Sequence, residues 1–245
     1  MPKKTKIREM FNNIAGDYDK LNHIMSLDID KSWRRKAIRI ALAPTPEEVA
    51  NESTKLHVLD LACGTGDFSI QMAKTMKKMG MSHGRVTGVD LSEGMLEVMK
   101  GKVEAEGLGD CISMEVGDGE NLHFGSGIFD RVTIAFGIRN FEDKEAGIKE
   151  MLRVLKPGGR MAILELSLPK NKIIRKLFSF YFFNVASTVG GKVSGQKGAY
   201  KYLPASVANF PQPEEFMAIM QSCGVSNVSH KSYSFGICRL FIGYR

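Results

Sequence analysis

Cysteine is scarce in this chain of 245 residues, and no long apolar run occurs in it. The four cysteines are Cys63, Cys111, Cys223 and Cys238. They form no C-x-x-C pair and are too widely spaced for a zinc cluster or a disulfide scaffold. We therefore expect no metal centre and a reducing, cytoplasmic compartment.

The chain also lacks the marks of a membrane-spanning or exported protein. Its longest apolar region, 177–189, is too short to cross a bilayer and is interrupted by polar residues. No apolar stretch with a small-residue cleavage site follows the basic N-terminus, so a secretory signal is not expected. A composition of 43% hydrophobic and 25% charged residues is that of an ordinary globular protein, which excludes disorder and a polytopic membrane protein.

Acidic residues are missing altogether from 166–213. The same segment holds seven basic residues, Lys170, Lys172, Arg175, Lys176, Lys192, Lys197 and Lys201. Their number equals the formal net charge of the whole chain, which is +7. A cationic segment of this kind favours nucleic acid, an anionic membrane surface or an acidic ligand, and composition does not choose among them.

The first part of the chain has helical periodicity. Four apolar residues recur with the spacing of one helix face: Ile7, Met10, Phe11 and Ile14. They predict a helix within 6–26, and a second helix is expected over 33–42, before two prolines. Residues 1–55 are therefore predicted to form a helical N-terminal extension.

From residue 56 onward, short apolar runs alternate with helical patterns. The predicted strands cover 56–62, 85–91, 111–116, 130–136 and 160–167. The predicted helices cover 67–79, 92–103, 144–155 and 213–223. Two further β-rich runs, 228–234 and 237–244, are expected to form a hairpin at Gly236. This alternation predicts an α/β fold whose sheet is mostly parallel, with an antiparallel strand at its end.

A glycine loop, Asp60-Leu-Ala-Cys-Gly64-Thr65-Gly66, closes the first predicted strand. Glycines let the backbone turn sharply and approach a ligand closely, so Gly64, Thr65 and Gly66 are candidate ligand contacts. The dinucleotide fingerprint requires a third glycine where Ser69 stands, and Asp67 occupies the helix start that would receive a pyrophosphate. A carboxylate about 4 Å from a phosphate costs roughly 1 to 4 kcal/mol. The loop is therefore predicted to accept a cation better than a polyphosphate.

Acidic side chains also follow the next two strands. Asp90 ends the second strand, where a carboxylate can accept both hydroxyls of a ribose. Asp118 and Gly119 follow the third strand, where a carboxylate and backbone amides can contact an adenine amino group. Taken singly, Asp67 could simply cap a helix and Asp118 could simply make a turn. Together these features predict a nucleoside that carries a positive charge, which describes S-adenosylmethionine.

Several blocks of the chain are typical of one enzyme family. They are Phe11-Asn-Asn-Ile-Ala-Gly-Asp-Tyr-Asp19, Leu59-Asp-Leu-Ala-Cys-Gly-Thr-Gly-Asp67, Phe136-Gly-Ile-Arg-Asn140, Arg153-Val-Leu-Lys-Pro-Gly-Gly159 and Phe210-Pro211. With these blocks the sequence resembles the class I S-adenosylmethionine-dependent methyltransferases. Within that class it resembles the menaquinone and ubiquinone biosynthesis C-methyltransferase family.

The resemblance implies a Rossmann-like fold with a seven-stranded sheet, a helical N-terminal extension and a helical insertion after strand five. It implies one methyltransferase domain divided into the extension (1–55), the cofactor-binding core (56–168), a basic apolar segment for substrate or lipid (169–205) and a final helix with two strands (206–245). The implied cofactor contacts are Thr65, Asp90, Asp118 and Gly119.

The chain departs from the family pattern in three places. Ala135 stands where the family usually has serine, and a histidine commonly found near Asp30 is absent. The closing His-x-Gly of the family is Phe241-Ile-Gly243 in this chain. The last two departures weaken the expectation of a histidine base.

The implied reaction is C-methylation of a prenylated hydroquinone, and a sulfonium methyl donor requires no metal. A ring carbon becomes nucleophilic when the ring hydroxyl loses its proton, so the site needs a cationic group near that oxygen. We expect Arg139 to stabilise the phenolate and Asn140 to orient the ring. A purely structural ion pair for Arg139 remains an alternative. The proton acceptor stays open among water and five side chains: His23, Asp28, Asp30, Tyr200 and Tyr202.

The acid-free segment suits a lipid substrate. An apolar stripe at helical spacing comprises Ile173, Ile174, Leu177, Phe178, Tyr181, Phe182 and Val185. Four cations flank it: Lys170, Lys172, Arg175 and Lys176. The stripe could lie on an anionic bilayer, cover the active site as ordinary core, or do both. A peripheral position at the inner face of the membrane is therefore expected alongside a cytoplasmic one.

Demethylmenaquinol is the favoured substrate, and a ubiquinone precursor comes next. Three other classes share some of these features. An RNA or DNA methyltransferase is disfavoured because no Pro-Pro-aromatic motif follows the fourth strand, so no nucleic-acid partner is expected. A nicotinamide oxidoreductase is disfavoured by Asp67 and Ser69. The third class is a non-catalytic cofactor-binding module, which only a turnover assay can exclude. Whether the chain forms a homo-oligomer stays open.

Overall fold

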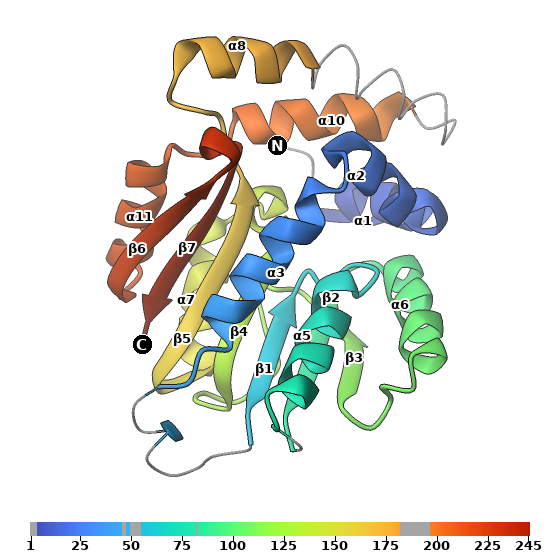
Figure 1. The fold of residues 1–245 in the computed structure, drawn as a ribbon, viewed down its shortest axis with the longest axis vertical. Helices are drawn as coiled ribbons and strands as arrows, with labels where there is room; N and C mark the ends of the chain where they lie inside the picture. The colour runs from blue at the N-terminus through green and yellow to red at the C-terminus, as the bar shows by residue number, and fades with distance from the viewer. Residues whose placement is uncertain (1–3, 46–47, 50–54, 82, 182–196) are drawn as a thin grey trace.

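The computed structural model describes residues 4–45, 48–49, 55–81, 83–181 and 197–245. Within them lies a seven-stranded sheet in the order β3-β2-β1-β4-β5-β7-β6 (Figure 1). The strands are β1 (His57–Leu61), β2 (Arg85–Asp90), β3 (Ile112–Val116), β4 (Phe129–Ala135), β5 (Leu155–Leu166), β6 (Ser226–Tyr233) and β7 (Cys238–Tyr244). Neighbours among β1 to β5 are parallel, whereas β7 runs antiparallel to both β5 and β6. The predicted α/β class, the mostly parallel sheet and the terminal hairpin are confirmed.

Strand β5 begins earlier than the sequence predicts. Helix α7 (Lys144–Val154) passes directly into the strand at Leu155, although we expected the strand to begin at Arg160. Leu155 pairs with Phe129, and the register between β4 and β5 then shifts before Arg131 pairs with Arg160. The Pro-Gly-Gly stretch lies between these two pairs, where the hydrogen-bond ladder is interrupted. The missing backbone N–H of the proline is therefore tolerated.

Helices cover both faces of the sheet. Besides α7, the helices of the described residues include α1 (Lys4–Ile14), α2 (Tyr18–Ser26), α3 (Ile29–Ala41), α5 (Asp67–Lys78), α6 (Glu93–Ala105), α8 (Lys172–Phe180), α10 (Lys197–Ala208) and α11 (Pro213–Ser222). Buried side chains of α3, α5 and α6 share one hydrophobic core with Val58, whereas those of α7 and α11 share another with its neighbour Leu59. Successive strand residues thus point to opposite faces, and both faces are buried.

A cap of helices lies at the carboxyl ends of the parallel strands. Figure 1 shows α1, α2, α8 and α10 gathered at that edge. Leu21 and Met25 of α2 pack there with Phe178 of α8 and Val207 of α10. The predicted helical extension and the helical insertion after β5 are therefore confirmed, and they meet above the edge where ligands of parallel sheets bind.

Two details of the extension differ from the prediction. The helix expected within 6–26 is two helices, because a 3₁₀ turn at Ala15–Asp17 separates α1 from α2. The chain then turns sharply between α2 and α3 through Leu27 and Asp28, which both have positive φ. This turn directs the start of α3 toward the carboxyl edge of the sheet.

None of the helices within the described residues combines the length and the apolar character that crossing a bilayer requires.

Two buried arginines of the sheet hold the carboxyl end of α3. Arg131 Nε donates to the carbonyl of Ala41 at 2.9 Å, and its Nη2 lies 2.5 Å from Glu48 Oε2. Arg160 Nη1 donates to the carbonyls of Ile40 and Ala43 at 2.7 and 2.6 Å. The last carbonyls of a helix lack intrahelical partners and carry partial negative charge, so two guanidinium groups satisfy them well. This anchoring positions α3, whose other end reaches the candidate site.

We expect Arg131→Met to destabilise the fold by about 3 kcal/mol, because charged hydrogen bonds to buried carbonyls would be lost without replacement. Urea unfolding followed by circular dichroism measures this change. Arg85→Met, at an exposed position on β2, is the matched control and should change stability by no more than about 0.5 kcal/mol. Equal midpoints for the two variants would contradict the anchoring role of Arg131.

Candidate active site

The glycine loop lies between β1 and α5, and its two glycines serve different purposes. Gly64 has a φ of 56° and lines a cleft at the carboxyl edge of the sheet. Gly66 has a φ of 82°, and a Cβ added to it would lie 2.4 Å from Cγ of Met99 on α6. The absence of a side chain at Gly66 therefore lets the loop pack against α6. Gly66 is not among the residues that line the cleft, and its contact with the cofactor stays a prediction.

Thr65 and Asp67 are also absent from the lining of this cleft. Thr65 is buried, and its hydroxyl donates a hydrogen bond to Asp19 Oδ1. The carboxylate of Asp67 pairs with Lys102, which also lies 2.8 Å from Asp19. Lys102 therefore offsets the charge of Asp67, so this carboxylate does not by itself repel a polyphosphate from the loop, contrary to the prediction.

Asp90, at the end of β2, lines the same cleft as Gly64. Its two oxygens accept the backbone N–H groups of Gly64 and Ser92 at 2.8 and 2.9 Å. Burial raises the pKa of Asp90, whereas these backbone hydrogen bonds act in the opposite direction. Each carboxylate oxygen can accept a second hydrogen bond, so the group remains able to bind a pair of hydroxyls.

Asp118 and Gly119 line the cleft at the end of β3. Asp118 lies 2.7 Å from Nζ of Lys4, which also lies 3.1 Å from Glu120. Through this contact α1 lies across the cleft, and its Ile7 and Phe11 line it as well.

The cleft has a volume of about 750 Å³, open space included. Asn140 and Ala135 line it near the end of β4, so the methyl of Ala135 stands where the family usually has a hydroxyl. The side chain of Asn140 accepts a hydrogen bond from the hydroxyl of Tyr202 at 3.0 Å. Of the eight predicted site residues, the cleft contains Gly64, Asp90, Asp118, Gly119 and Asn140.

A second cavity, of about 1150 Å³ with open space included, adjoins this cleft. Its walls come from α2, α3, α8, α10, the end of β5 and the turn before β7. They are mostly apolar: Met25, Leu27, Ile29, Trp33, Leu166, Ile174, Leu177, Phe178, Leu203 and Ile237. Tyr18 and Phe136 line both hollows, which therefore meet at these two side chains. We call the first hollow the polar cleft and the second the apolar cavity.

Arg139 lies in a 3₁₀ turn (Ile138–Asn140) and lines the apolar cavity, whereas Asn140 does not. Nη1 of Arg139 lies 2.7 Å from Oε1 of Glu165, and the Glu165 side chain is fully buried on β5. Although burial lowers the pKa of Arg139, Glu165 raises it above the ordinary value, so the guanidinium stays charged. The structural ion pair left open as an alternative is present. The Nε of Arg139 is buried with no hydrogen-bond partner among the described residues, so one donor remains to be satisfied.

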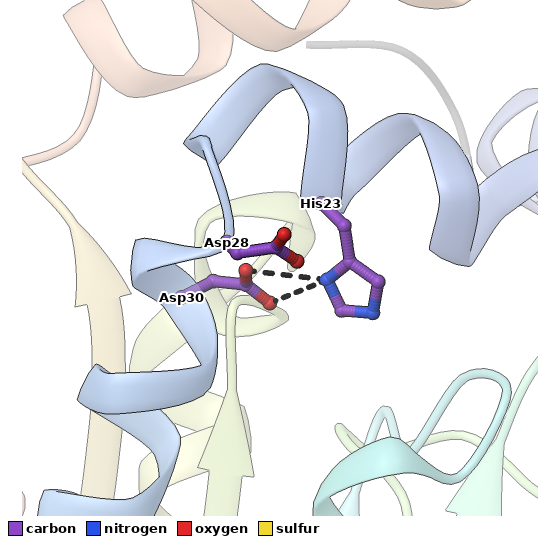
Figure 2. Close-up of side chains that lie close together, drawn as sticks. All are labelled: His23, Asp28 and Asp30. Atoms are coloured by element: carbon purple, nitrogen blue, oxygen red, sulfur yellow. Dashed lines mark hydrogen bonds and ion pairs between the residues drawn. The ribbon is translucent and has the colours of Figure 1, made fainter.

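Three of the candidate proton acceptors gather between α2 and α3 (Figure 2). Nδ1 of His23 lies 3.2 and 3.1 Å from the two carboxylate oxygens of Asp30. Asp28 is exposed and pairs with Lys31 at 2.6 Å. One atom from each of His23, Asp28 and Asp30 lies within 4.8 Å of the others, a spacing that could hold a cation. We assign no metal there, because both carboxylates already face cationic side chains. The side chain of Tyr200 lies outside those described.

The sequence alone indicated no role for four residues that line the polar cleft: Lys4, Phe11, Tyr18 and Phe136. All of them except Lys4 belong to the blocks that carry the family resemblance. The blocks marked these positions without showing which way the side chains point.

Comparison with known proteins identifies the family of this chain. A model of the ubiE/COQ5 methyltransferase family matches residues 1–245. The chain is 42% identical over 241 residues to the ubiquinone/menaquinone biosynthesis C-methyltransferase UbiE of Geobacter sulfurreducens, covering 98% of this chain and 89% of that protein. It is 41% identical over 239 residues to the demethylmenaquinone methyltransferase of Bacteroides fragilis, covering 98% and 92%.

Solved structures share the fold at low sequence identity. A chain from Haloferax volcanii, solved in complex with the Trm112 methyltransferase activator, superposes with a TM-score of 0.65 at 16% identity and covers 96% of both chains. Phosphoethanolamine N-methyltransferase 2 of Haemonchus contortus, solved with S-adenosyl-L-methionine, has a TM-score of 0.60 at 16% identity, covering 86% of this chain and 52% of that one. The full-length family match and the two relatives above 40% identity show that the chain belongs to the ubiE/COQ5 methyltransferase family.

Proposed function

We propose that this protein, as one methyltransferase domain, transfers a methyl group from S-adenosylmethionine to a ring carbon of a prenylated hydroquinone. Demethylmenaquinol is the substrate of first choice. The observation that carries the proposal is the junction at Tyr18 and Phe136, where a polar cleft of nucleoside size meets a large apolar cavity. The names of the relatives from Geobacter sulfurreducens and Bacteroides fragilis support the choice of quinone chemistry.

The polar cleft suits S-adenosylmethionine. Asp90 offers a buried carboxylate to the ribose hydroxyls, while Gly64 turns the backbone beside it. Asp118 and Gly119 lie where the adenine would sit, and α1 covers that end of the cleft. When bound, the cofactor supplies a methyl group already activated by a positively charged sulfur.

The apolar cavity suits a hydroquinone with a prenyl tail. Its wall holds few charged side chains, and Arg139 is one of them. The guanidinium of Arg139 can stabilise the ring oxygen as negative charge develops there. Asn140, held by Tyr202, lies on the cofactor side of the junction, so we assign it to positioning the donor end rather than to the ring.

We also propose that the mouth of the apolar cavity rests on an anionic bilayer at the inner face of the membrane. Leu27 and Leu177 line the cavity and are nevertheless 69% and 67% exposed, so they form its rim. On α8, Ile173 is 73% exposed, and Lys172, Arg175 and Lys176 are exposed beside it. Burying this rim in lipid would let a prenyl tail enter without crossing water.

The predicted apolar stripe of 173–185 divides between two roles. Ile174, Phe178 and Tyr181 line the apolar cavity as part of its wall. Leu177 lines it at the exposed rim, and Ile173 is exposed and outside the lining. Lys170 pairs with Glu214 on α11 and is less available to lipid than the other three cations. Phe182 and Val185, with Lys192, lie outside the described residues.

A turnover assay tests the proposed function. With methyl-labelled S-adenosylmethionine, label should enter chemically reduced demethylmenaquinone, and a ubiquinone-type benzoquinol should be the next best acceptor. The panel includes the oxidised quinones and an RNA oligonucleotide, which should remain unlabelled because neither offers a nucleophilic ring carbon that fits the apolar cavity. Label in the oligonucleotide but in no quinol would contradict the proposal.

We expect Arg139→Gln to lower kcat by about 100-fold, the usual effect of losing one donor to a developing oxyanion. Because the change would leave Glu165 as a buried unpaired carboxylate, the double variant Arg139→Gln/Glu165→Gln is assayed beside it. Calorimetry with S-adenosylhomocysteine checks that the polar cleft is intact. Arg35→Gln, an exposed position on α3, is the control. Full turnover by the double variant would contradict a role of Arg139 in catalysis and would show that its role is structural.

Replacing Lys172, Arg175 and Lys176 by glutamine should weaken binding to vesicles that contain phosphatidylglycerol by about 100-fold, since each cation contributes about 1 kcal/mol near anionic lipid. Co-sedimentation at low and high salt measures this effect. The matched control removes three exposed lysines of α5 and α6, Lys77, Lys78 and Lys100. Equal binding by both triple variants would argue against docking through α8.

A further inference from the structure

A row of titratable side chains connects the apolar cavity with the surface. Asp30 lines the cavity, and both of its oxygens lie close to Nδ1 of His23 (Figure 2). On the other side of the imidazole, Nε2 lies 3.5 Å from Oδ2 of Asp67. The side chains of His23 and Asp67 are each 23% exposed, whereas that of Asp30 is only 5% exposed. The row therefore begins at a buried carboxylate and ends at a group in contact with water.

Ring methylation requires such a route. The O–H bond of the ring hydroxyl breaks and leaves its electron pair on oxygen, and the ring carbon then bonds to the methyl group as the bond from sulfur to that methyl breaks. The ring carbon afterwards loses its hydrogen as a proton, and the ring oxygen regains one. One proton is released per turnover, and it must leave a cavity whose walls are mostly apolar.

Few groups in the cavity wall can accept that proton. The titratable side chains that line the cavity are Tyr18, Asp30, Arg34, Arg139 and Tyr181. Arginines are already protonated, and burial raises the pKa of Tyr18, so that this hydroxyl also keeps its proton at neutral pH. Burial alone would raise the pKa of Asp30, but the Ser26 hydroxyl, Arg34 and His23 lower it below the ordinary value. Asp30 is therefore the anionic side chain among them.

Asp30 also lies near the junction of the two hollows. Arg34 Nε lies 3.3 Å from Oδ2 of Asp30, and the guanidinium of Arg34 lies 5.2 Å from the centre of the Phe136 ring. Phe136 lines both the polar cleft and the apolar cavity. A ring placed to receive the methyl group at this junction therefore has Arg34 and Asp30 beside it.

We propose that Asp30 is a catalytic residue, which accepts the proton lost by the ring hydroxyl, and that His23 and Asp67 pass one proton onward to solvent. Asp30 forms a new O–H bond with the proton of the ring hydroxyl. When that bond breaks, the proton passes to Nδ1 of a neutral His23 whose hydrogen lies on Nε2, and the Nε2–H bond breaks as its proton passes to Asp67 and on to water. This inference rests on the proposed function, because it assigns a base for that reaction.

Other charges surround this row and enter its pH dependence. Asp30 faces Ser26 and His23 of α2 and Arg34 of its own helix. Asp67 of α5 faces Lys102 of α6, which in turn faces Asp19. Asp28 lies next to the row in Figure 2 but is exposed, pairs with Lys31 and does not line the cavity.

The test compares kcat for the wild type, Asp30→Asn, Asp30→Glu and Asp28→Asn with reduced demethylmenaquinone as acceptor. We expect Asp30→Asn to lose about 100-fold in kcat at pH 7, the lower range for loss of a general base, with little change in KM. Asp30→Glu should recover part of this loss, because it restores a carboxylate. Asp28→Asn should keep the wild-type rate.

The pH profile separates a base from a structural carboxylate. A ring hydroxyl ionises by itself near its own pKa, about 10 for a phenol. The deficit of Asp30→Asn should therefore shrink as the pH rises from 7 to 9.5, whereas a deficit from misplaced helices would stay constant. A constant deficit, or wild-type kcat in Asp30→Asn, overturns the proposal.

A second variant covers the case in which Asp30→Asn does not fold, as judged by melting and by S-adenosylhomocysteine binding. His23→Gln keeps the Asp30 carboxylate and should lose about 10-fold in kcat, again with a deficit that shrinks as the pH rises; an unchanged rate overturns the proposal. If the wild type labels no reduced quinone, the proposed function itself fails and the inference fails with it. If the wild type turns over and only the variants behave otherwise than expected, the function stands and the inference fails.

Discussion

A methyl group can pass directly between two bound molecules only where their sites touch. In this protein the polar cleft and the apolar cavity, which we propose bind the methyl donor and the acceptor, meet at Tyr18 and Phe136, and the surrounding elements position both side chains. Phe136 follows β4 in a left-handed conformation with a φ of 61°, which is costly for an aromatic residue. Its backbone N–H donates to the carbonyl of Leu164 at 2.7 Å, and its ring lies against Trp33 and beneath Arg34. The sheet and α3 together therefore hold the junction in place, and α2 brings Tyr18 to it from the other side.

The charged groups around this junction are held in pairs and short rows. Arg139 pairs with Glu165, Asp30 lies between His23 and Arg34, and Lys4 pairs with Asp118 at the far end of the polar cleft. Except for Asp30 with Arg34, which lie on the same helix, these pairs join different elements. A buried charge without such a partner would be expensive, so the pairs both orient the side chains and keep them ionised. The same pairing explains why Asp67, which looks from sequence like a charge aimed at the ligand, is offset by Lys102 instead.

Local pattern was sufficient for most of the sheet and for part of the site. Val58 and Leu59 show the reason. Successive residues of a strand buried on both faces are both apolar, so the apolar run can be recognised in the sequence without knowledge of the neighbouring strands. Gly64, Asp90 and Asp118 follow three successive strands, and parallel strands bring their carboxyl ends to one edge. Gly66 and Thr65 could not be placed in this way. Gly66 is required by the approach of Met99 from α6, and Thr65 turns toward Asp19 of the extension, contacts that no local pattern records.

The sequence by itself determined the α/β class, the mostly parallel sheet, the position of the glycine loop and membership of a methyltransferase family, because each depends on residue type and spacing along one segment. Only the tertiary structure decided that a polar cleft and an apolar cavity meet at Tyr18 and Phe136, that Arg139 faces both Glu165 and the cavity, and that Asp30 and His23 lie together. These features arise where helices of the N-terminal extension and helices that follow β5 pack together at the carboxyl edge of the sheet. The direction of a side chain there depends on the neighbours that confine it, and those neighbours come from distant parts of the chain.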